Sequence, residues 1–153
     1  MLWKNGTDWI YPKRNHHQNI ESVDVWKVFI PYANNIGTEL NDDNLNTFIG
    51  LPGMVCTESY LFVEVDMRSD QLSSENLAKY LQTKFVRYLH SLLKSSHHGT
   101  KNTYNLVPLQ DFSSSSDIDW IKSPSEIDLQ LYRKYNFSDD EIAFIESKIN
   151  EMK

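Results

Sequence analysis

The chain has 153 residues, a formal net charge of -6 and a hydrophobic content of 40%, which is the composition of an ordinary globular domain. This composition argues against a disordered or fibrous protein, and the apolar runs are far shorter than the roughly 20 residues of a membrane-spanning helix. Residues 1–20 lack the apolar block of a secretion signal, and the single cysteine, Cys56, suits a reducing compartment. We therefore expect one cytoplasmic domain over residues 1–153, with residues 1–20 as an N-terminal arm and no membrane attachment.

Three short strands are predicted from the alternation of apolar and polar residues. The first covers residues 26–31 and ends at Pro31, which has no N–H to donate to a neighbouring strand. Residues 32–53 are rich in Asn, Asp and Gly, which predicts a long polar loop with a possible functional role. The clearest alternation predicts a second strand over residues 55–65, and a third strand is predicted over residues 103–109.

One long helix and two short ones are predicted from apolar residues spaced three or four positions apart. The long helix runs from about Ser74 to Ser95, with Ser73 or Ser74 as its cap. Each short helix opens with a capping box, in which a serine and a glutamate side chain each accept a hydrogen bond from the other's backbone N–H. The boxes are Ser123 with Glu126 and Ser138 with Glu141. The expected fold is α+β, a small mixed or antiparallel sheet with the long helix packed across it and the two short helices at one end.

Charge is unevenly distributed along the chain. Residues 111–153 hold 5 basic and 10 acidic residues, whereas residues 83–101 contain no carboxylate at all. On a helix, Lys84, Arg87 and Lys94 share one polar face, which predicts a stripe that contacts phosphate groups. The solubility of a helix face explains such a stripe equally well. The residues expected to bind nucleic acid are Lys84, Arg87, Lys94, His97, His98 and Lys101.

No catalytic or metal site is predicted. The chain lacks a glycine-rich phosphate loop, an HExxH motif and paired cysteines. The acidic stretch Glu64-Val65-Asp66 also lacks the lysine that a nuclease of the usual restriction type carries. We expect the remaining candidates to be a structural thiol, loop histidines and solvated carboxylates: Cys56, His16, His17, His97, His98, Asp111, Asp117 and Asp119.

Six segments follow one another in a fixed order between residues 26 and 152. They are Lys27–Pro31, Thr57–Tyr60, Tyr80–Arg87, Val107–Phe112, Ile127–Tyr135 and Glu141–Glu146. Together they resemble the C-terminal region of bacterial type II restriction-modification enzymes, specifically adenine-specific DNA methyltransferases and their fused endonuclease relatives.

The resemblance implies a DNA target-recognition domain over residues 21–153 that belongs to a larger enzyme. In that family an upstream methyltransferase domain holds S-adenosylmethionine and a Pro-Pro motif for the flipped adenine. This chain has no Pro-Pro pair, so we expect it to be non-catalytic by itself and to hold no cofactor. The implied partners are double-stranded DNA and the upstream methyltransferase domain. Base reading would then fall to polar loop residues, namely Asn34, Asn35, Asn41 and Asn44.

A second interpretation comes from a different class of function. The acidic C-terminal helices would dock on the rest of a larger restriction-modification enzyme, and the chain would serve as a protein-interaction or scaffolding domain. The basic residues would then form a solvated face or pair with acids on that partner.

Overall fold

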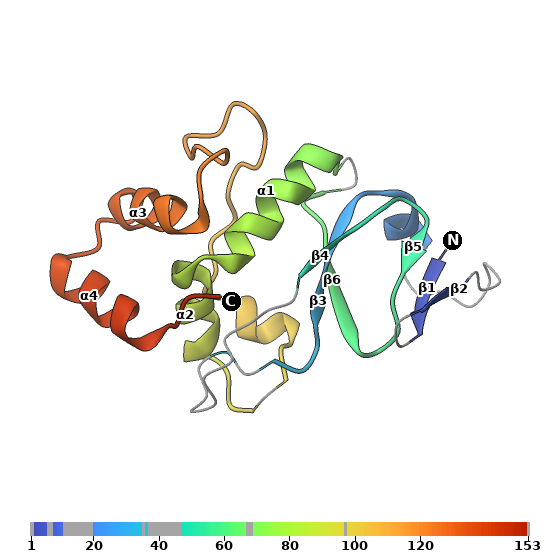
Figure 1. Ribbon diagram of the computed structural model, residues 1–153, viewed down its shortest axis with the longest axis horizontal. Helices are drawn as coiled ribbons and strands as arrows, with labels where there is room; N and C mark the ends of the chain where they lie inside the picture. The colour runs from blue at the N-terminus through green and yellow to red at the C-terminus, as the bar shows by residue number, and fades with distance from the viewer. Residues whose placement is uncertain are drawn as a thin grey trace.

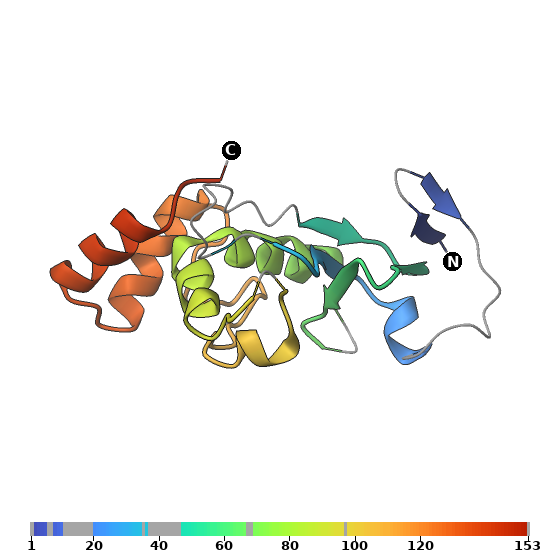
Figure 2. The same cartoon turned by 90° about the horizontal axis from the view of Figure 1, so that it is seen from below.

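The computed structural model describes residues 2–5, 8–10, 20–34, 36, 47–66, 69–96 and 98–152. Within them, two small sheets and four α-helices are present, so the predicted α+β class is confirmed. The sheets lie toward one end of an elongated molecule, and helices α3 (Pro124–Lys134) and α4 (Asp139–Lys148) lie at the other (Figures 1 and 2). None of the described helices is long and apolar enough to cross a membrane.

The central sheet is antiparallel and has β3 (Lys27–Pro31) between β4 (Phe48–Gly50) and β6 (Tyr60–Val63). The first predicted strand is therefore confirmed as the middle of this sheet. Val28 and Ile30 face the helices and belong to the main core cluster, while Lys27 and Phe29 point to the opposite face and are also buried. The side chains on both faces of the strand are therefore covered, and its two neighbouring strands leave it no free edge.

The second predicted strand, residues 55–65, is divided in two. Met54–Val55 forms β5, which pairs with β1 (Leu2–Asn5) in a second sheet, and β1 pairs in turn with β2 (Asp8–Ile10). A turn in which Tyr60 N–H bonds to the carbonyl of Thr57 separates β5 from β6. None of the three predicted strands lay in the N-terminal arm, residues 1–20. The structure places two strands there, β1 and β2.

The predicted long helix is wrong, because two helices occupy its range. Helix α1 (Gln71–Gln82) ends at Thr83, whose backbone is extended, with φ at -62° and ψ at 150°, and helix α2 (Lys84–Leu92) starts directly after it. The Thr83 hydroxyl caps α2 by accepting a hydrogen bond from the N–H of Val86. Helix α1 begins earlier than predicted, with Asp70 as its cap in place of Ser73 or Ser74.

The third predicted strand is also wrong. Residues 101–104 form a single 3-10 turn, η3 (Lys101–Tyr104), and the chain then runs as a loop. The loop is held from the side: the Tyr80 hydroxyl donates to the carbonyl of Pro108 at 2.7 Å, and Asn76 donates to the carbonyl of Phe112 at 2.9 Å. Tyr104 and Val107 pack partly against the core, whereas Leu106 and Leu109 are exposed.

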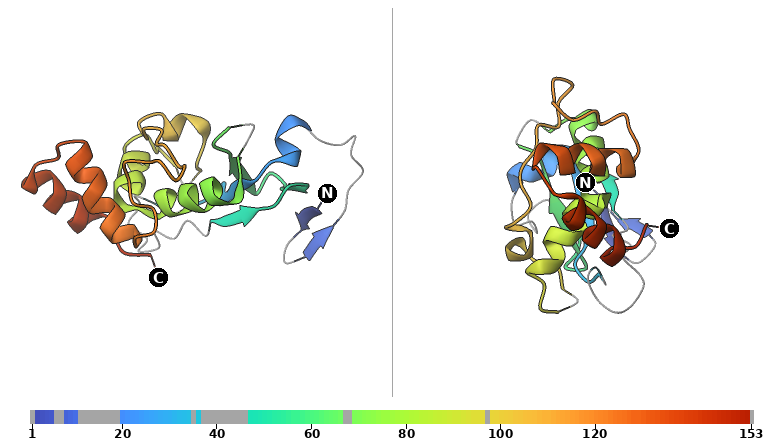
Figure 3. Two further views of the ribbon diagram at one scale, coloured as in Figure 1. Left: turned by 90° about the horizontal axis from the view of Figure 1, so that it is seen from above. Right: turned by 90° about the vertical axis from the view of Figure 1, so that its left-hand side faces the viewer.

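Helices α3 (Pro124–Lys134) and α4 (Asp139–Lys148) begin where the sequence predicts, and both capping boxes are present. They lie close together at one end of the molecule (Figure 3). Their buried residues continue the core that α1 and α2 share with the central sheet, and include Ile127, Leu131, Tyr132, Ile145 and Ile149. The helical end and the central sheet are therefore one hydrophobic unit.

Candidate nucleic-acid interface

Five of the six residues predicted to contact DNA are described, and they do not lie on one face. Lys84 and Arg87 begin α2 and lie beside α3, α4 and the C-terminal segment. Lys94, His98 and Lys101 follow the other end of α2, and Lys94 and His98 contact Asn34 and Ala33 just after β3. His97 lies outside the described residues. The expected stripe is thus divided between two regions of the surface.

Arg87 is enclosed by the protein and is only 2% exposed. Its Nε donates to the carbonyl of Gln82 at 3.1 Å, and its Nη1 donates to the carbonyl of Asn150 at 2.8 Å. A guanidinium cannot lose its charge, so burial requires that its N–H groups be satisfied by such acceptors. The expectation that Arg87 faces solvent is therefore wrong.

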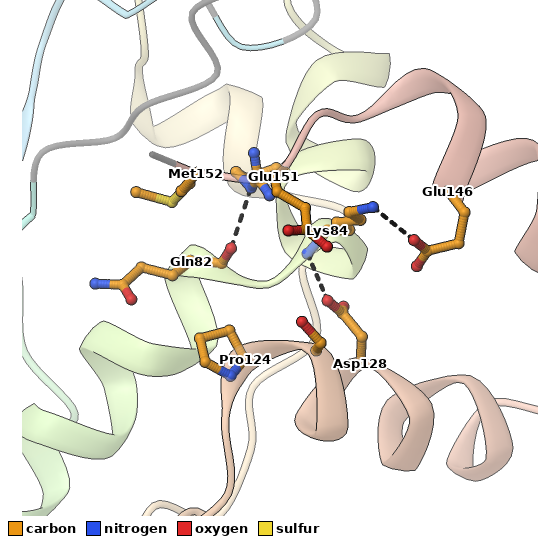
Figure 4. Close-up of a pocket in the computed structure, with 9 residues that line it drawn as sticks. Gln82, Lys84, Pro124, Asp128, Glu146, Glu151 and Met152 are labelled. Carbon is orange, nitrogen blue, oxygen red and sulfur yellow. Dashed lines mark hydrogen bonds and ion pairs between the residues drawn. The ribbon is translucent and has the colours of Figure 1, made fainter.

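Lys84 belongs to a polar cluster between three helices (Figure 4). Its ammonium group pairs with Glu146 at 2.6 Å, and the Tyr132 hydroxyl donates to the same carboxylate at 3.1 Å. The backbone N–H groups of Lys84 and Phe85 donate to the carboxylate of Asp128, which caps α2 from α3. Burial raises the pKa of Asp128 to about 6, against the opposing effect of these two hydrogen bonds.

A pocket of about 250 Å³ opens beside this cluster. Its ionisable lining residues are Lys84, Arg87, Asp128, Glu146 and Glu151. The carboxylates outnumber the cations, and the Lys84 ammonium is already paired with Glu146. This region is therefore a poor site for a polyanion such as DNA.

Lys94 fastens the end of α2 to the polar loop after β3. Its Nζ donates to Oδ1 of Asn34 at 2.6 Å and to the carbonyl of Ile36 at 3.2 Å. Asn34, a predicted base reader, is 6% exposed, so its amide helps to fix the start of the loop. The other three predicted base readers, Asn35, Asn41 and Asn44, lie outside the described residues.

The chain after α2 returns to the residues that follow β3 and pairs with them. His98 forms an antiparallel bridge with Ala33, and the N–H of Gly99 donates to the carbonyl of Tyr32 at 2.6 Å. The imidazole of His98 stacks on the ring of Tyr32, with 4.7 Å between ring centroids and 17° between planes. We call the surface formed by Tyr32, Ala33, His98, Thr100 and Lys101 the sheet-edge surface.

The sheet-edge surface is accessible and lacks carboxylates of its own. Ala33 and Lys101 are exposed, and Tyr32, His98 and Thr100 are partly exposed. Its residues come from two segments without any Asp or Glu, residues 25–38 and 76–110. Glu58 is an exposed acid in the neighbouring turn, whose Ser59 carbonyl accepts the Tyr32 N–H. Of the predicted residues, Lys101 is thus exposed and His98 partly exposed on this surface.

Sequence reasoning did not single out Tyr32 or Asp128. Tyr32 follows the proline that ends the predicted strand, and that position was its only signal. Asp128 lies 44 residues from Lys84, which it caps, so no local pattern connects the two. Both side chains act through contacts made by the folded chain.

Cys56 behaves as a structural thiol. Its Sγ donates to the carbonyl of Tyr60 at 3.4 Å, and burial raises its pKa to about 11, so the thiolate is scarce at neutral pH. Among the loop acids, Asp117 pairs with Lys134 at 2.7 Å, and Asp111 accepts the N–H of Ser113. Within the described ranges, no group of three His, Cys, Asp or Glu side chains is arranged to hold a metal ion.

No family model, no curated protein and no solved structure matches this chain.

Proposed function

We propose that this chain is the DNA target-recognition domain of a restriction-modification adenine methyltransferase, non-catalytic by itself, and that it contacts DNA through the sheet-edge surface. The observation that carries the proposal is the exposed Lys101, three residues after the partly exposed His98, in segments without acids. The ordered segments that resemble this enzyme class give the proposal its biological setting. The chain then works in the cytoplasm beside an upstream methyltransferase domain that binds S-adenosylmethionine.

The charge distribution supports a local contact more than a general affinity for DNA. A chain of net charge -6 is repelled by DNA on average, so binding needs a region where cations meet no carboxylates. Neither of the segments that form the sheet-edge surface contains a carboxylate, whereas the pocket near Lys84 is rich in acids. Affinity of the isolated chain is therefore weak, and its salt dependence is shallow, because Lys101 is the lysine that this surface presents to phosphate.

The recognition step follows from the same placement. Lys101 and His98 position the chain on phosphate groups, and the polar loop that starts at Tyr32 supplies the base contacts. Asparagine amides suit this role, because an amide donates to and accepts from adenine at once. Asn35, Asn41 and Asn44 follow Asn34, which Lys94 fixes in place.

Selection from a pool of random DNA duplexes tests this function. The chain is immobilised at low salt, the retained duplexes are amplified, and the cycle is repeated with a double variant, Lys101→Ala and His98→Ala. Enrichment of one short motif by the parent chain, and its loss in the variant, is the expected result. Retention of no motif by the parent chain would exclude a recognition domain.

A docking function is the second candidate, and exposed apolar side chains favour it. Ile121 is 91% exposed and Phe144 is 48% exposed, in the part of the chain where acids exceed bases. Such side chains suit a basic partner with an apolar surface. If the selection enriches no DNA, docking on a larger restriction-modification enzyme becomes the better account.

A further inference from the structure

The rings of Tyr32 and His98 stack on each other where the chain after α2 pairs with Ala33. We propose that they form a stacking platform for an unpaired nucleobase, so that the preferred ligand of the sheet-edge surface is a duplex carrying an extrahelical base. This inference rests on the proposed function, because it specifies the DNA that the surface takes. It assigns a role to Tyr32, which lies outside the residues predicted from the sequence.

The chain contains a second pair of the same kind, which shows what a purely structural stack looks like. His90 stacks on Tyr104 with 4.1 Å between centroids and 28° between planes, and His90 is only 1% exposed. Tyr32 and His98, by contrast, are both partly exposed. Aromatic rings that remain accessible to water keep apolar area available for a ligand.

The exposed pair is held rigidly by the backbone on both sides. Tyr32 donates to the carbonyl of Ser59 at 3.0 Å and accepts from Gly99 at 2.6 Å, and Ala33 bridges to His98. The backbone packs closely here, since a Cβ at Gly99 would lie 3.1 Å from Nδ2 of Asn34, so a side chain there would displace this amide slightly. A ring pair fixed before binding loses little conformational freedom when a base stacks on it.

The surroundings select a nucleotide over other planar ligands. Lys101 is exposed three residues after His98, and neither of the segments that build the surface contains a carboxylate. A base that stacks on the rings brings its phosphate into this cationic region. Stacking tolerates any base, since each base has a π face, and one stacked base contributes about tenfold in affinity.

Two labelled duplexes test the proposal, one uninterrupted and one with a single bulged 2-aminopurine. Fluorescence anisotropy gives the affinity of the chain for each DNA, and 2-aminopurine emission reports stacking directly. We expect about tenfold tighter binding of the bulged duplex and a fall in emission on binding. Tyr32→Phe should keep both effects, because it keeps the ring.

Tyr32→Leu should remove the quenching and the preference, so that the two duplexes bind with equal affinity. Phe144→Leu is the matched control, because it removes an exposed ring on α4 and should change neither effect. Tyr32→Met replaces Tyr32→Leu if the latter does not fold, as judged by circular dichroism. Equal affinity of the parent chain for both duplexes, or a preference that survives loss of the ring, would overturn this inference alone. Failure to bind either duplex would overturn the proposed function with it.

Discussion

Arg87 and Asn150 are joined by a hydrogen bond of 2.8 Å from the guanidinium Nη1 to the backbone carbonyl, across 63 residues of sequence. The same guanidinium donates to the carbonyl of Gln82 at the end of α1. A residue expected to contact DNA thus connects the junction of two helices to the C-terminal segment. The guanidinium of Arg87 therefore stabilises the folded chain through these two hydrogen bonds.

Replacement of Arg87 should therefore act on stability. Arg87→Met keeps much of the side-chain volume but leaves buried carbonyls without their donors, which costs about 3 kcal/mol in free energy of unfolding. Urea denaturation followed by circular dichroism measures this cost. Arg133→Met, at an exposed position of α3, is the control and should change stability by less than about 0.5 kcal/mol. Equal effects of the two changes would show that the internal hydrogen bonds of Arg87 contribute nothing.

Thr83 should be a second position of high sensitivity. Its hydroxyl donates to the carbonyl of Tyr80 at 2.6 Å and accepts the N–H of Val86, so it ends one helix and begins the next. Thr83→Ala should lower the free energy of unfolding by about 1 kcal/mol. Ser125→Ala, at an exposed position in the first turn of α3, provides the comparison in thermal denaturation. An unchanged melting temperature for Thr83→Ala would contradict the capping role.

His90 and Asp128 should make opposite contributions to the pH dependence of stability. Burial lowers the pKa of His90 from 6.5 to about 4, so its contribution is present above pH 6.5 and is lost as the pH falls through 4. Burial raises the pKa of Asp128 from 3.8 to about 6, so its contribution is present below pH 3.8 and is lost as the pH rises through 6. Each effect amounts to about 3 kcal/mol, and between pH 4 and 6 they oppose each other.

Two substitutions separate these contributions. In His90→Phe, stability relative to the parent chain should fall as the pH rises from 4 to 6.5, because the His90 contribution is missing. In Asp128→Asn, stability relative to the parent chain should rise over the range from pH 4 to 6. Urea unfolding at four pH values in this range measures both slopes, and slopes of the same sign would contradict the assignment.

Signals contained within a few residues predicted local structure well. The capping boxes at Ser123 and Ser138 each need only a glutamate three residues away, and both helices start where expected. The strand that ends at Pro31 was also found, because its enclosed position demands apolar residues. Such features depend on neighbours in sequence, so the sequence alone suffices for them.

Features that depend on distant residues were missed. The apolar spacing of Leu77, Leu81 and Phe85 continues through Thr83 without a gap, so periodicity predicts one helix where there are two. The N–H groups freed at this break are satisfied by Asp128, from another helix. A strand was likewise predicted at residues 103–109 from alternation alone, yet no neighbouring strand pairs with it.

In the candidate site, too, features set by local sequence were predicted and features set by distant residues were missed. The segment without acids, which holds His98 and Lys101, was visible in the sequence and lies on the sheet-edge surface. The contacts of Lys84 and Arg87 could not be predicted from the sequence, because their partners Glu146 and Asn150 lie about sixty residues further along the chain. Charge on a helix predicts exposure only when the rest of the fold leaves that face open.

The salt dependence of DNA binding tests the central claim most directly. The dissociation constant for a short duplex is measured over a range of salt concentrations for the parent chain, for Lys101→Ala and for Lys122→Ala. Lys122 is the control, because it is equally a single exposed cation but pairs with Glu126 at the start of α3. We predict that Lys101→Ala lowers the slope of log K against log salt by about 1, through the loss of one phosphate contact, while Lys122→Ala leaves it unchanged. Equal slopes for all three proteins would contradict a DNA interface at the sheet-edge surface.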